Sequence, residues 1–114
     1  MDIPQRPIAR GKMSEREREF RSKLAKLIHE GGILRGTLAP RERTCGRPTC
    51  KCAKGEKHAS LYLVFKEEGK YRQIYVPKEL EELVRAWVSN HQKARHFLEE
   101  ISRVHREKVL KRDV

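Results

Sequence analysis

Four side chains that can bind a metal lie close together in the sequence, in the segment RERTCGRPTCKCAKGEKHAS of residues 41–60. They are Cys45, Cys50, Cys52 and His58, and they include every cysteine of the chain. Three thiolates and one imidazole form the donor set of a tetrahedral Cys3His zinc site. Because four protein ligands leave no open position for a water molecule, such a site is structural rather than catalytic. The spacing therefore predicts one zinc ion that stabilises the loop around it.

The residues between these ligands suit a metal-binding loop. Gly46, Pro48 and Gly55 permit the tight turns that a chain needs in order to wrap an ion. Neighbouring lysine and arginine side chains lower the pKa of cysteine thiols and so favour the thiolate that binds metal.

Three other interpretations remain open, because the single residue between Cys50 and Cys52 departs from the commonest zinc spacings. The cysteines are free thiols, or two of them form a disulfide, or all three hold an iron–sulfur cluster with His58. A disulfide would suit a secreted protein, but we recognise no signal peptide at the N-terminus. An iron–sulfur cluster is disfavoured by the many charges in the loop. Spacing alone does not identify the metal, and zinc is the ion we expect.

The segments on either side of this loop predict the elements that position it. Residues 61–66 and 71–76 are rich in β-branched and aromatic side chains and are separated by the sequence EEGK, which predicts a β-hairpin. Strand alternation places Leu61, Leu63 and Phe65 on an aliphatic face and tyrosines on the other. These tyrosines either stack on nucleic-acid bases or pack beneath a helix with their hydroxyls at the rim. Residues 33–43 contain a proline and suit an edge strand or an extended lead-in.

Helical patterns occupy both ends of the chain. Ser14 and Glu17 match a capping box, and apolar residues recur at helical spacing up to Gly31. Pro77 is expected at the first position of a second, much longer helix. The predicted fold class is α+β, with an N-terminal helix, a small antiparallel β-sheet or hairpin carrying the Cys3His zinc knuckle, and a long C-terminal helix. We expect a mobile basic arm at residues 1–13 and a single small domain at 14–112, comprising the helix 14–30, the strands and knuckle in 33–76, and the long helix 77–112.

The long helix is expected to be only partly covered by the shorter one. Leu83 and Trp87, near the hairpin, are expected in the core. Residues further along would form an exposed apolar band, and we predict that this band mediates a homodimer or binds a partner helix, through Phe97, Leu98, Ile101 and Val104. Asn90 would limit alternative registers of that pairing. The competing possibility is that the first helix shields the band within one chain.

The metal-loop sequence CGRPTCKCAKGEKH, followed by a hairpin-like stretch, YVPKEL and AWV, resembles an uncharacterised family of short basic bacterial and archaeal proteins, classed as a domain of unknown function. The resemblance covers roughly residues 35–107. The family motif falls on Cys45, Gly46, Pro48, Cys50, Cys52, Gly55 and His58, and then on Tyr75, Val76 and Pro77. The resemblance implies no established activity.

Charge indicates what kind of partner the chain binds. The 27 Lys and Arg residues against 16 Asp and Glu give a net charge of +11, which favours a polyanion such as nucleic acid. Residues 1–58 carry 15 basic and 7 acidic side chains, whereas residues 59–114 carry 12 and 9, so the positive charge is concentrated around the metal loop. The alternative is a basic surface that serves only solvation. No apolar run approaches the ~20 residues of a membrane span, and we expect a cytoplasmic protein without a membrane partner, with association with the nucleoid as an option.

The sequence thus predicts a non-enzymatic zinc-knuckle protein that binds nucleic acid. Its expected phosphate contacts are Arg41, Arg43, Arg47, Lys51, Lys54, Lys57, Lys66 and Arg72. DNA is preferred to RNA because a β-hairpin can enter a major groove. The alternative function is a protein-interaction or assembly factor that acts through the long helix. An enzyme or thiol-based redox sensor using Cys50 and Cys52 is disfavoured, because no motif gathers a nucleophile, a base and an orienting partner.

Overall fold

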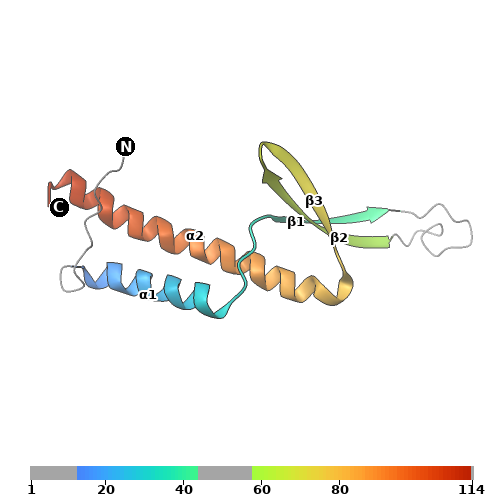
Figure 1. Cartoon of the computed structure of the whole chain (residues 1–114), viewed down its shortest axis with the longest axis horizontal. Coiled ribbons are helices and arrows are strands. Elements are labelled where there is room, and N and C mark those ends of the chain that lie inside the picture. The colour runs from blue at the N-terminus through green and yellow to red at the C-terminus, as the bar shows by residue number, and fades with distance from the viewer. Residues whose placement is uncertain (1–12, 44–57, 114) are drawn as a thin grey trace, which may run out of the picture. The chain divides into compact units, whose positions relative to one another are not determined.

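The computed structural model describes residues 13–43 and 58–113. The elements in chain order are α1 (Glu15–Glu30), β1 (Thr37–Arg43), β2 (His58–Glu67), β3 (Lys70–Val76), the 3-10 turn η3 (Lys78–Leu80) and α2 (Glu81–Leu110) (Figure 1). The α+β class predicted from sequence is therefore confirmed, with an N-terminal helix, a small antiparallel sheet and a long C-terminal helix. The zinc knuckle expected between β1 and β2 falls on residues 44–57, outside the described residues.

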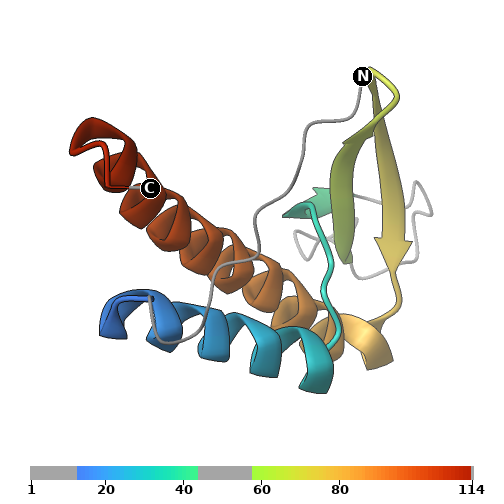
Figure 2. The same cartoon turned by 60° about the vertical axis from the view of Figure 1, so that its left-hand side comes forward.

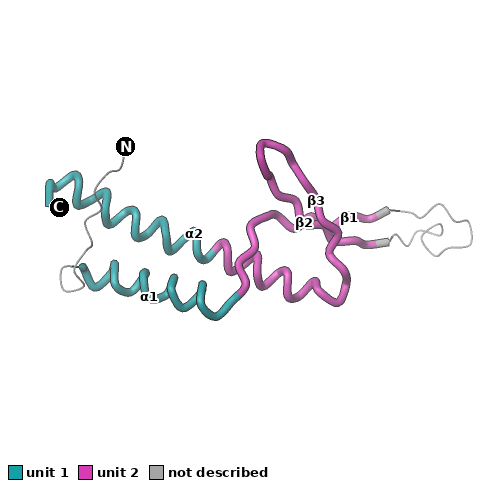
Figure 3. The backbone as a smooth tube through the Cα atoms, in the orientation of Figure 1, with its two compact units in different colours: residues 1–31, 93–114 teal, residues 32–92 magenta. Residues whose placement is uncertain are grey.

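The chain divides into two compact units (Figure 3). The helical unit consists of residues 1–31 and 93–114, and the sheet unit consists of residues 32–92. Helix α2 contributes its first part to the sheet unit and its second part to the helical unit. Each unit has its own packing.

In the helical unit, α1 begins at the predicted cap. The Ser14 hydroxyl accepts a hydrogen bond from the backbone N–H of Glu17 at 3.1 Å, which satisfies one of the free donors of the first turn. The helix ends at Gly31, whose N–H donates to the carbonyl of Leu27 at 3.0 Å. Helix α1 lies alongside the second part of α2 (Figure 2), and Phe20 of α1 packs against Phe97 of α2 with ring centroids 6.1 Å apart.

In the sheet unit, three antiparallel strands are arranged in the order β1-β2-β3. The predicted hairpin is present, and Glu68 and Gly69 at its turn have φ angles of 51° and 80°. Two consecutive positive φ angles are typical of the two-residue turns whose twist matches that of the flanking strands. Strand β1 lies at an edge of the sheet, where Pro40 is tolerated because its missing N–H is not needed by a second neighbour.

The core of the sheet unit lies between one face of the sheet and the first part of α2. Its buried residues are Leu61, Leu63, Val76, Val84 and Val88. The expectation that Leu83 belongs to this core is wrong, since Leu83 is 45% exposed. Trp87, also expected in the core, is only half-buried and is not among the residues of this cluster. Adjacent residues of a helix point about 100° apart, and the sheet covers the face that carries Val84 and Val88 rather than the face that carries Leu83.

Candidate nucleic-acid interface on the sheet

The sheet has one face in the core and one face turned away from it. Cross-strand pairing joins Leu61 to Val76 and Leu63 to Ile74 on the core face. On the opposite face it joins Tyr62 to Tyr75, Val64 to Gln73, and Lys66 to Tyr71. We call this second surface the tyrosine face, defined by Arg41, Tyr62, Lys66, Tyr71, Gln73 and Tyr75. The alternative in which the tyrosines pack beneath the helix is therefore wrong, because α2 covers the other face.

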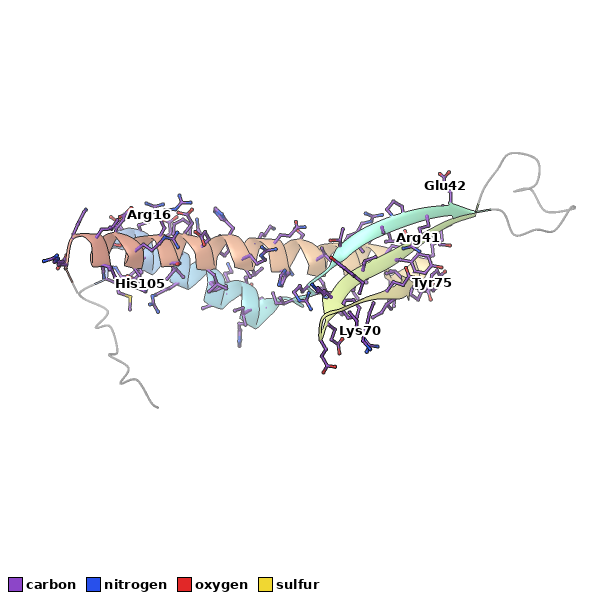
Figure 4. All side chains as sticks on the ribbon, turned by 90° about the horizontal axis from the view of Figure 1, so that it is seen from above. Arg16, Arg41, Glu42, Lys70, Tyr75 and His105 are labelled. Carbon is purple, nitrogen blue, oxygen red and sulfur yellow. The ribbon has the colours of Figure 1, made fainter. Side chains whose placement is uncertain are left out.

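One end of the tyrosine face carries a pair of rings and a guanidinium group. The rings of Tyr62 and Tyr75 are 5.8 Å apart in an edge-to-face arrangement, a favoured geometry for aromatic pairs. The guanidinium carbon of Arg41 lies 5.1 Å from the centroid of Tyr62, within cation–π distance. Figure 4 shows Arg41 and Tyr75 on one side of the sheet and Glu42 on the other side of β1. Tyr75 is 54% exposed, so part of its ring is available to a ligand.

The other end of the tyrosine face carries a single ring and a second cation. Tyr71 is 78% exposed, and the Lys66 ammonium lies 5.7 Å from its centroid. Arg35 adds a third cation nearby, because its Nη2 donates to the backbone carbonyl of Lys66 at 2.7 Å. Tyr71 and Tyr75 are four residues apart on β3, a separation of about 13 Å at ~3.3 Å per residue. The exposed Gln73 lies between them.

The structure separates the phosphate contacts expected from the sequence. Arg41 and Lys66 are brought onto the tyrosine face. Arg72 lies on the core face, since its cross-strand partner is Phe65. Arg43 is the last residue of β1, but its side chain lies outside the described part of the chain, as do Arg47, Lys51, Lys54 and Lys57 entirely. Sequence reasoning missed Arg35 and Gln73, although strand alternation placed Gln73 on the same face as the tyrosines.

Of the expected metal ligands, Cys45, Cys50 and Cys52 and the side chain of His58 lie outside the described residues. Over residues 13–43 and 58–113, no three His, Cys, Asp or Glu side chains are grouped in a way that could hold a metal ion. The strands do fix both ends of the segment in question. Arg43 at the end of β1 and His58 at the start of β2 are cross-strand partners, so the segment 44–57 connects two neighbouring positions.

The helical unit contains a buried charge that sequence reasoning missed. Glu17 is 0% exposed, and its Oε2 accepts a hydrogen bond from Arg21 Nε at 2.7 Å. His105 Nε2 and Lys108 Nζ lie 3.5 Å and 3.6 Å from Glu17 Oε1. Within the described part of the chain, neither Glu17 Oε1 nor His105 Nε2 has a hydrogen-bond partner. The signal was present in the sequence, because Glu17 lies three residues before Phe20 and so occupies a position on the apolar stripe of α1.

Two opposing effects act on the pKa of Glu17. Burial raises the pKa, whereas the hydrogen bond from Arg21 and the charges of Arg21, His105 and Lys108 lower it. The net result is a pKa below the ordinary value of 4.5, so Glu17 is ionised at neutral pH. A similar effect acts on Glu100, where a hydrogen bond from Arg16 lowers the pKa. These two carboxylates pair charges between α1 and the second part of α2.

The exposed apolar band expected on α2 is largely covered. Val104 is buried, Ile101 is half-buried, and Phe97 is half-buried against Phe20, so α1 shields much of this stripe within the helical unit. Of the four residues expected at an interface, only Leu98 is mostly exposed, at 55%. Asn90, expected at a seam between chains, donates a hydrogen bond to the Gly32 carbonyl at 3.0 Å. A homodimer or partner helix stays a prediction.

Comparison with known proteins gives a match to a family model. The family model described as "Domain of unknown function (DUF6788)" matches residues 11–86, which include α1, the whole sheet and the first turns of α2. No curated protein and no solved structure matches the chain. Within residues 13–43 and 58–113, neither helix combines the length and the apolar character that crossing a membrane requires.

Proposed function

We propose that this chain, which belongs to the family described as a domain of unknown function (DUF6788), binds nucleic acid. The proposed function is non-enzymatic. The observation that supports this proposal is the tyrosine face, where exposed rings and cations lie together on a sheet whose other face is the core. Aromatic rings on a sheet can stack on bases, and neighbouring cations can neutralise phosphates. A surface of this composition suits a polyanion that also presents flat apolar groups.

The distribution of charge supports the same partner. Residues 35–57, which lead into and out of β1, contain seven Arg or Lys residues and two Glu residues. Arg41 belongs to both this basic segment and the tyrosine face. In this proposal the basic metal loop contributes further phosphate contacts through Arg47, Lys51, Lys54 and Lys57. The proposal includes a preference for DNA over RNA, which a comparison of DNA and RNA probes tests.

We further propose that Cys45, Cys50, Cys52 and His58 hold one structural zinc ion. The donor set fits, because three thiolates and one imidazole complete a tetrahedral site. The pairing of Arg43 with His58 supports this proposal, since it brings the two ends of the ligand-bearing segment to neighbouring positions. A bound zinc ion would supply folding energy to that segment and no chemical reaction.

Salt dependence of binding tests the proposed function. We would measure the anisotropy of labelled duplex DNA, single-stranded DNA and single-stranded RNA from ~50 to ~300 mM salt. The double variant Arg41→Gln, Lys66→Gln should bind every probe more weakly than the parent protein does, whatever the probe's sequence. It should also reduce the slope of log K against log salt, by about 0.9 per lost phosphate contact on duplex DNA or about 0.7 on single strands.

A matched control is available on the same sheet. Lys70→Gln with Arg72→Gln removes the same charge, but both residues lie on the core-face side of β3, paired with Glu67 and Phe65. This variant should keep the parent slope. If the two double variants lost affinity equally, net charge alone would explain binding and the tyrosine face would not be the interface. If the parent bound none of the three probes at ~50 mM salt, the proposed function would be wrong.

A further inference from the structure

We infer that the tyrosine face binds an unpaired strand of nucleic acid, with bases stacked on Tyr71 and Tyr75. This inference rests on the proposed function and specifies its ligand. Both tyrosines are more than half exposed. The ring of Tyr71 has the Lys66 ammonium beside it, and the ring of Tyr75 has the ring of Tyr62 beside it. A ring that is free on a sheet surface offers a flat platform to a base.

The geometry of the sheet disfavours a paired duplex as the ligand. Bases within a duplex are stacked on each other, so their flat faces are not available to tyrosine rings. A major groove admits a two-stranded ribbon or a helix. The hairpin β2–β3 is not a free ribbon, since β1 extends it on one side and α2 packs on its core face. The face is therefore suited to bases that have already left a duplex, or that never formed one.

The spacing of the rings sets the length of strand that this face can take. The separation of about 13 Å between Tyr71 and Tyr75 is about four times the 3.4 Å rise of a stacked strand. One strand can therefore stack bases on both rings only if it is several nucleotides long or is stretched between them. Gln73, between the rings, carries an amide that can donate to and accept from a base edge.

Cations lie at both ends of the tyrosine face, where they can neutralise the phosphates of a strand that crosses it. Arg41 lies at the end that holds Tyr62 and Tyr75, and Lys66 and Arg35 lie at the end that holds Tyr71. Tyr62 is half-buried between Arg41 and Tyr75, so we assign it a positioning role rather than direct stacking. A single strand therefore meets positive charge at both ends of the face and a ring near each end.

The experiment compares ring removal with ring retention. The probe is a labelled single-stranded oligonucleotide of about 10 thymidines, together with a duplex of the same length, at ~100 mM salt. Tyr71→Leu and Tyr75→Leu should each weaken binding of the single strand by about 5- to 150-fold, the range found when a stacking ring is removed. Tyr71→Phe and Tyr75→Phe keep the ring and should bind within about 3-fold of the parent.

Ile74→Ala is the matched control, because Ile74 lies on the same strand, is 52% exposed and faces the opposite side. It should leave binding unchanged, and unchanged circular dichroism of the tyrosine variants would show that the sheet is intact. Equal affinity for single strand and duplex, with no loss in the leucine variants, would overturn this inference while the salt-dependent function stands. Absence of binding to either probe would overturn both and would leave a protein as the ligand of this face.

Discussion

Gly32 should be intolerant of any side chain, because it packs directly against Trp87 of α2. A Cβ atom at Gly32 would lie 2.3 Å from Trp87 Nε1, 2.4 Å from Cε2 and 2.5 Å from Cδ1. The same segment is tied to α2 by two hydrogen bonds. Asn90 Nδ2 donates to the Gly32 carbonyl at 3.0 Å, and the Leu34 N–H donates to the Trp87 carbonyl at 3.1 Å.

The size of the effect of Gly32→Ala follows from these distances. Carbon atoms normally approach to about 3.5–4.0 Å, so the indole or the backbone must move by more than ~1 Å. Forcing extra volume into a packed site costs about 1–3 kcal/mol, and lifting the segment would also weaken two hydrogen bonds worth roughly 1 kcal/mol each. Alanine returns about 0.4–1 kcal/mol by restricting the unfolded chain. We expect a net loss of about 2 kcal/mol, or roughly 8–16 °C in Tm.

The fluorescence of Trp87 can report the effect of Gly32→Ala directly, because Trp87 is the only tryptophan of the chain. Urea unfolding followed by tryptophan emission would give the free energy of unfolding, and the emission of the folded protein would report movement of the indole. Asn90→Ala, which removes one hydrogen bond without adding volume, should cost about 1 kcal/mol. Gly69→Ala is the control, since no atom beyond its own residue and its two chain neighbours lies within 4 Å of its added Cβ.

The control separates packing from backbone strain. Gly69 has a φ of 80°, so alanine there should lower stability by roughly 1 kcal/mol without altering the emission of Trp87. Gly32→Ala should change both. A Gly32→Ala protein with the parent's stability and emission would refute the close packing of this segment on α2.

Two further predictions concern the helical unit and the metal loop. The folded-state pKa of Glu17 is below 4.5, so its contribution to stability is present above about pH 4.5 and is lost as the pH falls through the lower folded-state value. Glu17→Gln should therefore destabilise α1 at pH 7. The loss should be less than the ~3–5 kcal/mol of a fully buried pair, because the cations around Glu17 are partly exposed. The variant should also reduce the dependence of stability on pH in the acid range, measured by circular dichroism. An unchanged acid transition in Glu17→Gln would contradict this assignment. Zinc removal by a chelator, or Cys50→Ser, should reduce the metal content measured by native mass spectrometry from one ion per chain to none while α2 keeps its helical signal, and a parent protein purified without any metal would count against the zinc site.

The predictions that succeeded from sequence depend on neighbouring residues. The cap at Ser14, the hairpin turn at Glu68 and Gly69, and the alternation that separates Leu61 from Tyr62 are determined by side chains a few positions apart. The burial of Glu17 was missed, although its place on the apolar stripe of α1 follows from residues a few positions apart. The ionic partners of Glu17 could not be predicted from neighbouring residues, because His105 and Lys108 lie far along the chain.

The sequence by itself determined the order of the helices and strands and that tyrosines share one face of the hairpin, because these properties follow from short-range periodicity and turn chemistry. Only the tertiary structure decided which face of the sheet α2 covers, and with it that Tyr71 and Tyr75 are exposed. It also decided that Val84 rather than Leu83 enters the core and that Phe97 is covered by α1. The physical reason is that a helix of 30 residues carries apolar side chains on more than one side, and the side that is buried depends on which distant element packs there.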